Sequence, residues 1–256
     1  MDPLLTHRAG GVLTVTLNRP ERKNAVDGAL WRALAATFRQ TARSTEDRVV
    51  VVTGAGGDFC AGADLSDLEA ATDHQLVRMR MIHDVALALH ELPQPTIAKV
   101  DGVAVGAGCN LAFGCDLVVS SDRARFSEIF SRRGLSLDFG GSWLLPRRVG
   151  LHRAKELAFF GELLGAAEAE RLGLVNRVVP AGELDEAVDE WAARLAAGPP
   201  LALSLTKRLL DDAAGMSLPE ALEREGAAQA LNIMSEDGKE AIRAFLERRE
   251  PDFEGR

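Results

Sequence analysis

The chain is poor in the residues that build metal sites, disulfide frameworks and membrane spans. Its 256 residues include only three cysteines, Cys60, Cys109 and Cys115, and no two of them form a C-x-x-C pair. Reduced thiols are therefore expected, and a metal site is not. The five histidines are scattered and form no H-E-x-x-H pattern. No window approaches about 18 consecutive apolar residues, which excludes a transmembrane helix.

Positive charge is also scarce, because 30 Lys and Arg residues face 38 Asp and Glu residues and leave a net charge of −8. Nucleic acid is not expected as the main partner, since binding its phosphates requires a positive face. The N-terminal MDPLLTHRAGG has no basic region followed by an apolar run, so no signal peptide is predicted. We expect a cytoplasmic protein with no nucleic-acid or membrane partner.

What is present is a globular composition, with 46% hydrophobic and 27% charged residues. Apolar runs at 49–53 and Thr96–Val100 predict buried strands, each followed by a glycine-rich loop. The second loop leads into a predicted helix at Ala107–Gly114. Strands alternating with helices indicate an α/β core. Further strands are predicted at Val12–Leu17 and 116–120, and a helix at 27–42 with Asp27 as its N-cap.

The C-terminal part of the chain is almost wholly helical in pattern. Short helices are predicted at 143–145 and 151–160, around Pro146 and Gly150, and longer ones at 183–197, 201–213, Leu218–Met234 and 237–248. Apolar helix faces far from the core require cover, which indicates subunit contacts. We therefore predict a core at 1–195 that carries the site and a helical oligomerisation region at 196–256.

The two glycine-rich loops are the first candidate site. Neither has the G-x-G-x-x-G pattern of dinucleotide-binding loops, because Phe59 and Leu111 stand where the third glycine is required. Backbone N–H groups at a helix N-terminus are unpaired and carry the positive end of the helix dipole. Two such loops facing one point would form an oxyanion hole. The alternative is that the glycines serve only as tight turns.

The order and spacing of several motifs resemble the enoyl-CoA hydratase/isomerase (crotonase) superfamily over nearly the full length. The motifs are LNRPERKNAVD (17–27), DFCAGADL (58–65), GVAVGAGCNLAFGCDLVVS (102–120), ARFSEIFSRRGLSLDFGGSWLLPRRVG (124–150), AEAERLGLVNRVV (167–179) and GKEAIRAFLERREPDF (238–253). The resemblance implies a ClpP/crotonase-like α/β fold, a spiral of ββα units with a C-terminal helical trimerisation region. It also implies a homotrimer or a dimer of trimers that acts on an acyl-CoA thioester. Coenzyme A is then part of the substrate, and no separate cofactor and no metal are expected.

The same resemblance implies roles for individual residues. The oxyanion-hole donors would be the backbone N–H groups of Ala63 and Ala107, where small side chains leave room for the thioester carbonyl. The residues expected to contact the substrate or its CoA moiety are Arg22, Lys23, Ala61, Asp64, Leu65, Gly106 and Phe130. Asp64 is expected to cap a turn rather than to catalyse. Arg22 and Lys23 would meet the CoA phosphates, or else form a solvated basic loop.

The chain departs from the family where hydratases carry two glutamates. Asn110 stands three residues after the second oxyanion donor, and Phe130 stands four residues before Gly134. Hydration calls for two carboxylates that share one water, and neither is present at these positions. Glu128 lies two residues before Phe130, but the flanking sequence does not favour its reaching the site. We expect it to be a surface or hydrogen-bonding residue.

Asp138 is the carboxylate that remains, and it stands where isomerases of the superfamily place an acid. The loop GAGxNLA together with GL-x-x-D-x-GG-x-W-x-LPR resembles the subgroup of 1,2-epoxyphenylacetyl-CoA isomerase and the enoyl-CoA isomerases. One carboxylate suits a proton shuttle beside an enolate. Apolar neighbours (Leu135, Leu137 and Phe139) would raise its pKa. Without the family context, an Asp beside glycines is as often a turn residue.

Asn110 and two aromatic residues complete the predicted site. The Asn110 amide would orient the substrate or Asp138, or would only cap the first turn of its helix. Trp143 and Phe139 would line the acyl pocket, or would pack in the core.

The predicted function is an enoyl-CoA isomerase in which Asp138 is the acid/base and Asn110 assists. The first alternative is an enoyl-CoA hydratase that recruits Glu128, or a water held by Asn110 and Asp138. The second is a non-catalytic acyl-CoA-binding homologue.

Overall fold

A twisted, mostly parallel sheet forms the centre of the computed structural model, which describes residues 2–66 and 74–256. Within these residues the sheet has six strands, in the order β1 (Leu4–Ala9), β2 (Val12–Leu17), β3 (Val49–Gly54), β4 (Thr96–Val100), β6 (Leu117–Ser121) and β9 (Arg177–Val179). Only β1 and β2 are antiparallel neighbours, and every later pair is parallel. The strands predicted from their apolar runs are confirmed.

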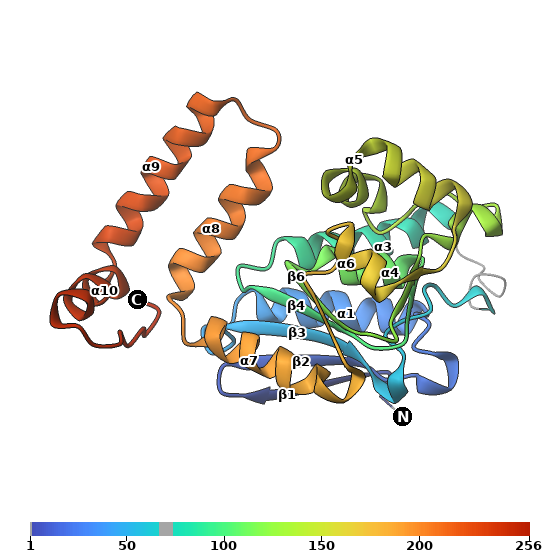
Figure 1. Cartoon of the computed structure of the whole chain (residues 1–256), viewed down its shortest axis with the longest axis horizontal. Helices are drawn as coiled ribbons and strands as arrows, with labels where there is room; N and C mark the ends of the chain where they lie inside the picture. The colour runs from blue at the N-terminus through green and yellow to red at the C-terminus, as the bar shows by residue number, and fades with distance from the viewer. Residues whose placement is uncertain (1, 67–73) are drawn as a thin grey trace.

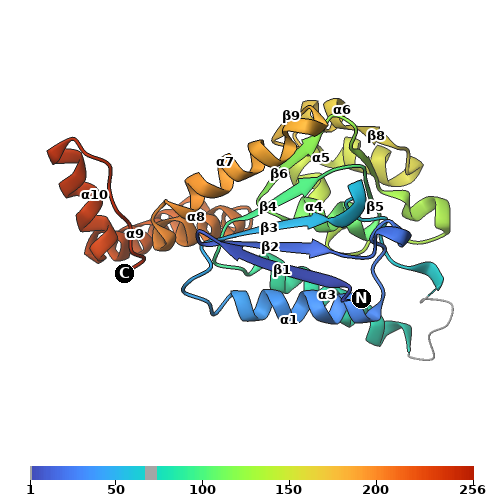
Figure 2. The same cartoon turned by 90° about the horizontal axis from the view of Figure 1, so that it is seen from below.

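Helices cover both faces of this sheet, as Figure 2 shows. α1 (Gly28–Thr41) and α3 (Gln75–His90) lie on one face, and α7 (Leu184–Ala196) lies on the other. The valines of β3 are buried on both sides, so alternate residues face two separate cores. The predicted N-cap is confirmed, because Asp27 accepts a hydrogen bond of 2.9 Å from the backbone N–H of Leu30.

A second, smaller sheet stands beside the first and holds the glycine-rich segment in place. Among the described residues it contains β5 (Val103–Val105), β7 (Arg125–Ser127) and β8 (Leu164–Gly165). α4 (Ala107–Gly114) follows β5, and its residues from Ala107 to Phe113 are all buried. A single residue, Gly106, therefore separates the first residue of α4 from the end of β5, a strand of this smaller sheet.

The segment after the glycine-rich loop differs in part from the prediction. One helical segment, α5 (Gly141–Phe160), is interrupted at Gly150, where φ is 75° and ψ is 161°. Gly150 therefore separates two helices as expected. Pro146 does not end the first helix but lies inside it, so the prediction of a three-residue helix there is wrong. α6 (Ala166–Arg171) follows after β8.

The last helices extend away from the core (Figure 1). They are α8 (Pro200–Ala213), α9 (Leu218–Met234) and α10 (Glu236–Glu247), close to the predicted ranges. Several of their large apolar side chains are exposed, among them Leu210, Met234 and Phe245. No helix within residues 2–66 and 74–256 has the length and apolar character needed to cross a bilayer.

Candidate active site

The two glycine-rich loops lie against each other, as the sequence predicted. The backbone N–H of Cys60 donates to the oxygen of Val103 at 2.9 Å, and the N–H of Val105 donates to the oxygen of Cys60 at 2.9 Å. Gly62 has a positive φ of 90°, and a Cβ there would lie 2.7 Å from the Val105 oxygen and 3.6 Å from the Ala107 nitrogen. Only glycine permits this approach, which brings the first loop to the start of α4.

The backbone N–H groups of Ala63 and Ala107, which lie at this junction, have no backbone acceptor among the described residues. Ala107 is the first residue of α4, where the helix offers its N–H no partner. The residues on either side of Ala63 both bond to Val26: Gly62 accepts from the Val26 N–H, and the Asp64 N–H donates to the Val26 oxygen. The N–H of Ala63 itself donates to no backbone oxygen among the described residues. The predicted donors are therefore brought together and are available to a ligand oxygen.

The loop with Arg22 and Lys23 borders this junction. It begins as a short 3-10 helix, η1 (Pro20–Arg22), and the oxygen of Lys23 accepts a hydrogen bond of 2.9 Å from Ala61 N–H. The Lys23 ammonium lies 3.6 Å from an Asp58 carboxylate oxygen, and the Lys23 side chain is 63% exposed. Such an exposed pair contributes little to stability, so the Lys23 side chain is available to an anionic ligand.

Asn24 is a residue that the sequence reasoning missed. It is fully buried at a positive φ of 56°. Its amide donates to the backbone oxygens of Ala55 and Asp58 at 2.9 and 2.7 Å, and its oxygen accepts from Arg19 N–H at 2.9 Å. Asn24 therefore ties the basic loop to the first glycine-rich loop. Asparagine tolerates the left-handed conformation better than most residues. An Asn in this loop was therefore the one sequence feature that could have indicated a structural role.

Asp64 caps a turn, as expected, and is fully engaged in doing so. Its carboxylate accepts from the Ser66 hydroxyl at 2.6 Å and the Ser66 N–H at 3.1 Å, and it lies 3.0 Å from the Arg19 guanidinium. The Ser66 hydroxyl and the Arg19 guanidinium lower the pKa of Asp64 despite its burial. Leu65, next in the chain, is 50% exposed. Asp64 thus shapes the loop that carries Ala63.

The fully buried side chain of Asn110 joins two carboxyl-bearing segments. Its Nδ2 atom donates to Glu128 Oε2 at 3.2 Å and to the backbone oxygen of Asp138 at 3.1 Å. The predicted contact between Asn110 and Asp138 is present, but it goes through the backbone rather than the carboxylate. Asn110 Oδ1, Glu128 Oε1 and Asp138 Oδ1 are buried without a protein hydrogen-bond partner among the described residues.

Glu128 is not a surface residue, so that part of the prediction is wrong. It is 3% exposed and follows β7 directly. Phe126, two residues earlier, stacks on Phe113 of α4, with ring centroids 5.6 Å apart. Because residues two apart in a strand share a face, Glu128 is directed toward α4 as well. The other part of the prediction, a hydrogen-bonding residue, is confirmed by its contact with Asn110.

The two carboxyl groups have different pKa values. Burial raises the pKa of Asp138 from 3.8 to about 6. Burial raises the pKa of Glu128 further, from 4.5 to about 8, and the charge of Asp138 adds to the increase while the Asn110 hydrogen bond opposes it. At pH 7, which lies between these two values, Asp138 is mainly ionised and Glu128 is mainly neutral.

Apolar residues surround Asp138, although not all of those predicted. Phe139 is 1% exposed at a positive φ of 49°, and its ring centroid lies 5.6 Å from that of Trp31. Leu137 is half-buried. Leu135, however, is 51% exposed, so the prediction that it would help to desolvate the Asp138 carboxylate is wrong. After η3 (Ile129–Arg133) begins, the residues from Ser131 to Ser136 are all exposed, and Leu135 lies within this exposed stretch.

Phe130 lies against the oxyanion loop. Its side chain is buried, and its Cζ atom would be 3.7 Å from a Cβ on Gly106. An apolar ring therefore lies beside Gly106, at the start of α4. It occupies the position at which the family resemblance predicts the second glutamate of a hydratase.

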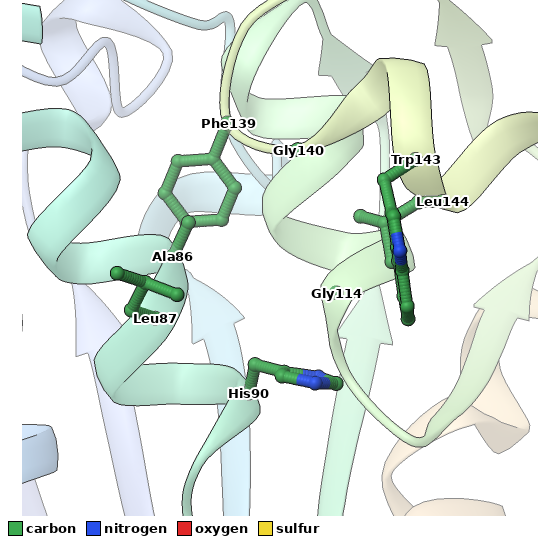
Figure 3. Close-up of a pocket in the computed structure, with 8 residues that line it drawn as sticks. All are labelled: Ala86, Leu87, His90, Gly114, Phe139, Gly140, Trp143 and Leu144. Carbon is green, nitrogen blue, oxygen red and sulfur yellow. The ribbon is translucent and has the colours of Figure 1, made fainter. Parts of the chain in front are cut away.

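An apolar cavity of about 370 Å³ lies beside the Asp138 loop (Figure 3). It is lined by Ala86, Leu87, His90, Gly114, Phe139, Gly140, Trp143 and Leu144. Phe139 and Gly140, which directly follow Asp138 in the chain, belong to this lining. Trp143 lines this cavity, and Phe139 contributes both to the cavity wall and to the core. Across residues 2–66 and 74–256, no group of three His, Cys, Asp or Glu residues is placed to hold a metal ion.

Comparison with known proteins agrees with this geometry. The family model for enoyl-CoA hydratase/isomerase matches residues 7–256. The chain is 38% identical to 1,2-epoxyphenylacetyl-CoA isomerase of Escherichia coli and 36% identical to 2,3-dehydroadipyl-CoA hydratase of Escherichia coli, in both cases over all of both chains. The crystal structure of enoyl-CoA hydratase from Bacillus anthracis superimposes with a TM-score of 0.95 at 33% identity, covering 99% of this chain and 100% of that one. With its crotonase fold and a full-length family match, the chain belongs to the enoyl-CoA hydratase/isomerase family.

Proposed function

We propose that this enzyme isomerises enoyl-CoA or epoxyacyl-CoA thioesters, with Asp138 as the acid/base. The observation that carries the proposal is the partly buried Asp138 carboxyl, with a pKa raised to about 6, in the loop whose next two residues, Phe139 and Gly140, line the apolar cavity. The two positions that would supply a hydratase with glutamates hold Asn110 and Phe130. One carboxyl is sufficient for moving a proton from carbon to carbon.

The reaction follows from these groups. The thioester oxygen accepts hydrogen bonds from the N–H groups of Ala63 and Ala107. Asp138 removes a proton from the carbon next to the carbonyl, and the C–H electron pair becomes part of an enolate whose charge the two donors stabilise. When Asp138 returns the proton to the far end of the conjugated system, the carbonyl re-forms and the carbon–carbon double bond has moved.

The CoA moiety would lie along the loops that border the oxyanion donors. Arg22 and Lys23 would meet its phosphates, while Ala61, Asp64, Leu65 and Gly106 would contact the remainder and Phe130 would contact the acyl chain. The exposed ammonium of Lys23 and the exposed side chain of Leu65 support this path.

Hydration is the second candidate, and one observation favours it. Glu128 Oε1, Asn110 Oδ1 and Asp138 Oδ1 are buried oxygens without protein partners, and two carboxyls sharing a water suit hydration. In that reaction Asp138 would activate the water and neutral Glu128 would protonate the carbon next to the thioester.

Product analysis separates these functions. Incubation with a 3-enoyl-CoA and, separately, a 2-enoyl-CoA is expected to give double-bond migration, without 3-hydroxyacyl-CoA. Hydroxylated product as the main outcome would make the enzyme a hydratase. Binding of both thioesters without turnover would make it an acyl-CoA-binding homologue.

The pKa of Asp138 predicts how activity and stability depend on pH. Activity should rise as pH rises through about 6, where the carboxyl becomes a base. Its pKa is raised in the folded state, so stability is lost as pH rises from about 4 to about 6. Asp138→Asn should therefore be more stable than the wild type at pH 7, by up to about 3 kcal/mol, and should lose that advantage near pH 4. Thermal unfolding of both proteins at the two pH values measures this, and equal stability at both would contradict it.

We also propose that the protein assembles as a homotrimer or a dimer of trimers. Phe245 is 82% exposed, Met234 is 75% exposed and Leu210 is 72% exposed, on helices that extend from the core. Faces of this kind usually mark subunit contacts. Sedimentation should give about three or six times the 27.5 kDa chain mass, and Phe245→Glu should shift it toward the monomer. A monomeric wild type at micromolar concentration would contradict the assembly.

A further inference from the structure

Glu128 is a buried carboxyl group that the proposed isomerisation does not use. Its Oε2 atom accepts from Asn110 Nδ2 at 3.2 Å, and its other oxygen, Oε1, has no protein hydrogen-bond partner among the described residues. The titratable groups that face it are Cys109 from α4 and Asp138 from the segment before α5. No cation in the described part of the chain acts on it. A buried carboxyl that lacks a cation requires a reason other than ion pairing.

The Asn110 amide links Glu128 to the Asp138 segment. Both amide hydrogens are in use, one on Glu128 Oε2 and the other on the Asp138 backbone oxygen. A Cβ on Gly141 would lie 2.9 Å from Asn110 Cγ, so the amide is also wedged against the start of α5. The Asp138 oxygen accepts a second bond, from Gly141 N–H at 2.9 Å. This chain of contacts holds the turn from Asp138 to Gly141.

We propose, on the basis of the isomerase function above, that Glu128 is a positioning residue: it holds the Asn110 amide, which fixes the backbone at Asp138 and so directs the Asp138 carboxyl into the site. Glu128 acts through Asn110 and transfers no proton itself. Deleting its acceptor leaves one amide hydrogen unpaired and frees the amide to turn away from the Asp138 oxygen.

Glu128 can hold the Asn110 amide in either protonation state, but the reaction is favoured when Glu128 is neutral. An ionised Glu128 would place a second negative charge near Asp138 and near the enolate that forms in the reaction, and this opposes the stabilisation that the oxyanion hole provides. The pKa of Glu128 is raised to about 8, so activity should fall as pH rises through about 8. The wild type should then have a bell-shaped pH profile, with the acidic limb from Asp138.

The test compares Glu128→Gln with Glu128→Ala in the isomerisation assay between about pH 5 and 10. The Gln variant keeps a neutral acceptor for Asn110, so its kcat at pH 7 should stay within about threefold of wild type and its alkaline limb should vanish. The Ala variant should lose about 10–100-fold in kcat, as expected for a misdirected acid/base, with KM changed by less than about threefold.

Two further variants separate positioning from general loss of stability. In an Asn110→Ala background, Glu128→Ala should cost less than about twofold, because the residue through which it acts is gone. Gln94→Ala is the matched control. Gln94 is also buried, its amide binds the backbone oxygens of Thr41 and Ser44, and its Oε1 is unpaired. It should lower the melting temperature like Glu128→Ala and leave kcat within about twofold of wild type.

Three results would overturn the proposal: Glu128→Ala as active as Gln94→Ala, Glu128→Gln as inactive as Glu128→Ala, or an alkaline limb that persists in Glu128→Gln. If Glu128→Ala does not fold, the Glu128→Gln profile alone decides. Crystal structures of the variants test positioning without turnover. The contact from Asn110 Nδ2 to the Asp138 oxygen should be lost in the Ala variant and kept in the Gln variant. This result stands even if the isomerase assignment fails in the product analysis.

Discussion

Asp138→Asn is expected to lower kcat for double-bond migration by about 10²–10⁴-fold, the range for loss of a general acid/base. The amide has nearly the shape of the carboxylic acid but accepts no proton at neutral pH. The backbone oxygen of Asp138, which binds Asn110 and Gly141, is unaffected. Thioester binding should therefore remain, with KM within about threefold of wild type. Steady-state kinetics with a 3-enoyl-CoA measures both constants.

Asp189→Asn is the control for this substitution. Asp189 lies exposed on α7, on the far side of the main sheet, and its loss should leave both kinetic constants unchanged. Double-bond migration that persists at the wild-type rate in Asp138→Asn would contradict the assigned role. Hydration that survives in Asp138→Ala would point to a different active group.

Ala107→Pro is expected to lower kcat/KM by about 10²–10³-fold or more, the loss typical of removing one oxyanion-hole donor. Proline has no N–H, and its ring carbon would stand where the thioester oxygen binds. The first residue of a helix is the position at which proline fits best. Gly106, the residue before it, has φ 56° and ψ −126°. This is the mirror image of the extended conformation that residues before proline adopt. Glycine has no Cβ, so it adopts either mirror image and is compatible with a following proline. The fold should therefore tolerate the change.

Ala166→Pro provides the matched comparison. Ala166 is likewise buried, follows a glycine and begins a helix, α6, but it lies outside the proposed site. Its kcat/KM should stay within about threefold of wild type. Ala107→Pro that folds normally and turns over like Ala166→Pro would exclude the Ala107 N–H from the oxyanion hole.

Much of the fold follows from patterns within short segments. The buried strands β3 and β4 are recognisable in the sequence as apolar runs. Asp27 marks the start of a helix, and Gly150 marks a break between two helices. α3 was not predicted, because it is apolar on both faces: Val85 and Leu89 are buried while Val77 and Leu87 are exposed. No single stripe marks such a helix. The wall of the cavity that α3 contributes, with Ala86, Leu87 and His90, was therefore missed. β5 and β7, with three residues each, are too short to give a pattern.

The sequence by itself determined the family, and it predicted the chemistry that depends on residue type at a fixed place in a motif. The small residues Ala63 and Ala107 suit the proposed backbone donors, and Asn110 and Phe130 stand where the family resemblance places the two glutamates of a hydratase. The tertiary structure alone decided which carboxyls are buried together. Asn110, Glu128 and Asp138 come from a helix, the end of a strand and a loop, and Trp31 packs on Phe139 from a fourth segment. A pKa depends on the sum of such neighbours, and their burial is set by packing between segments that are distant in the chain.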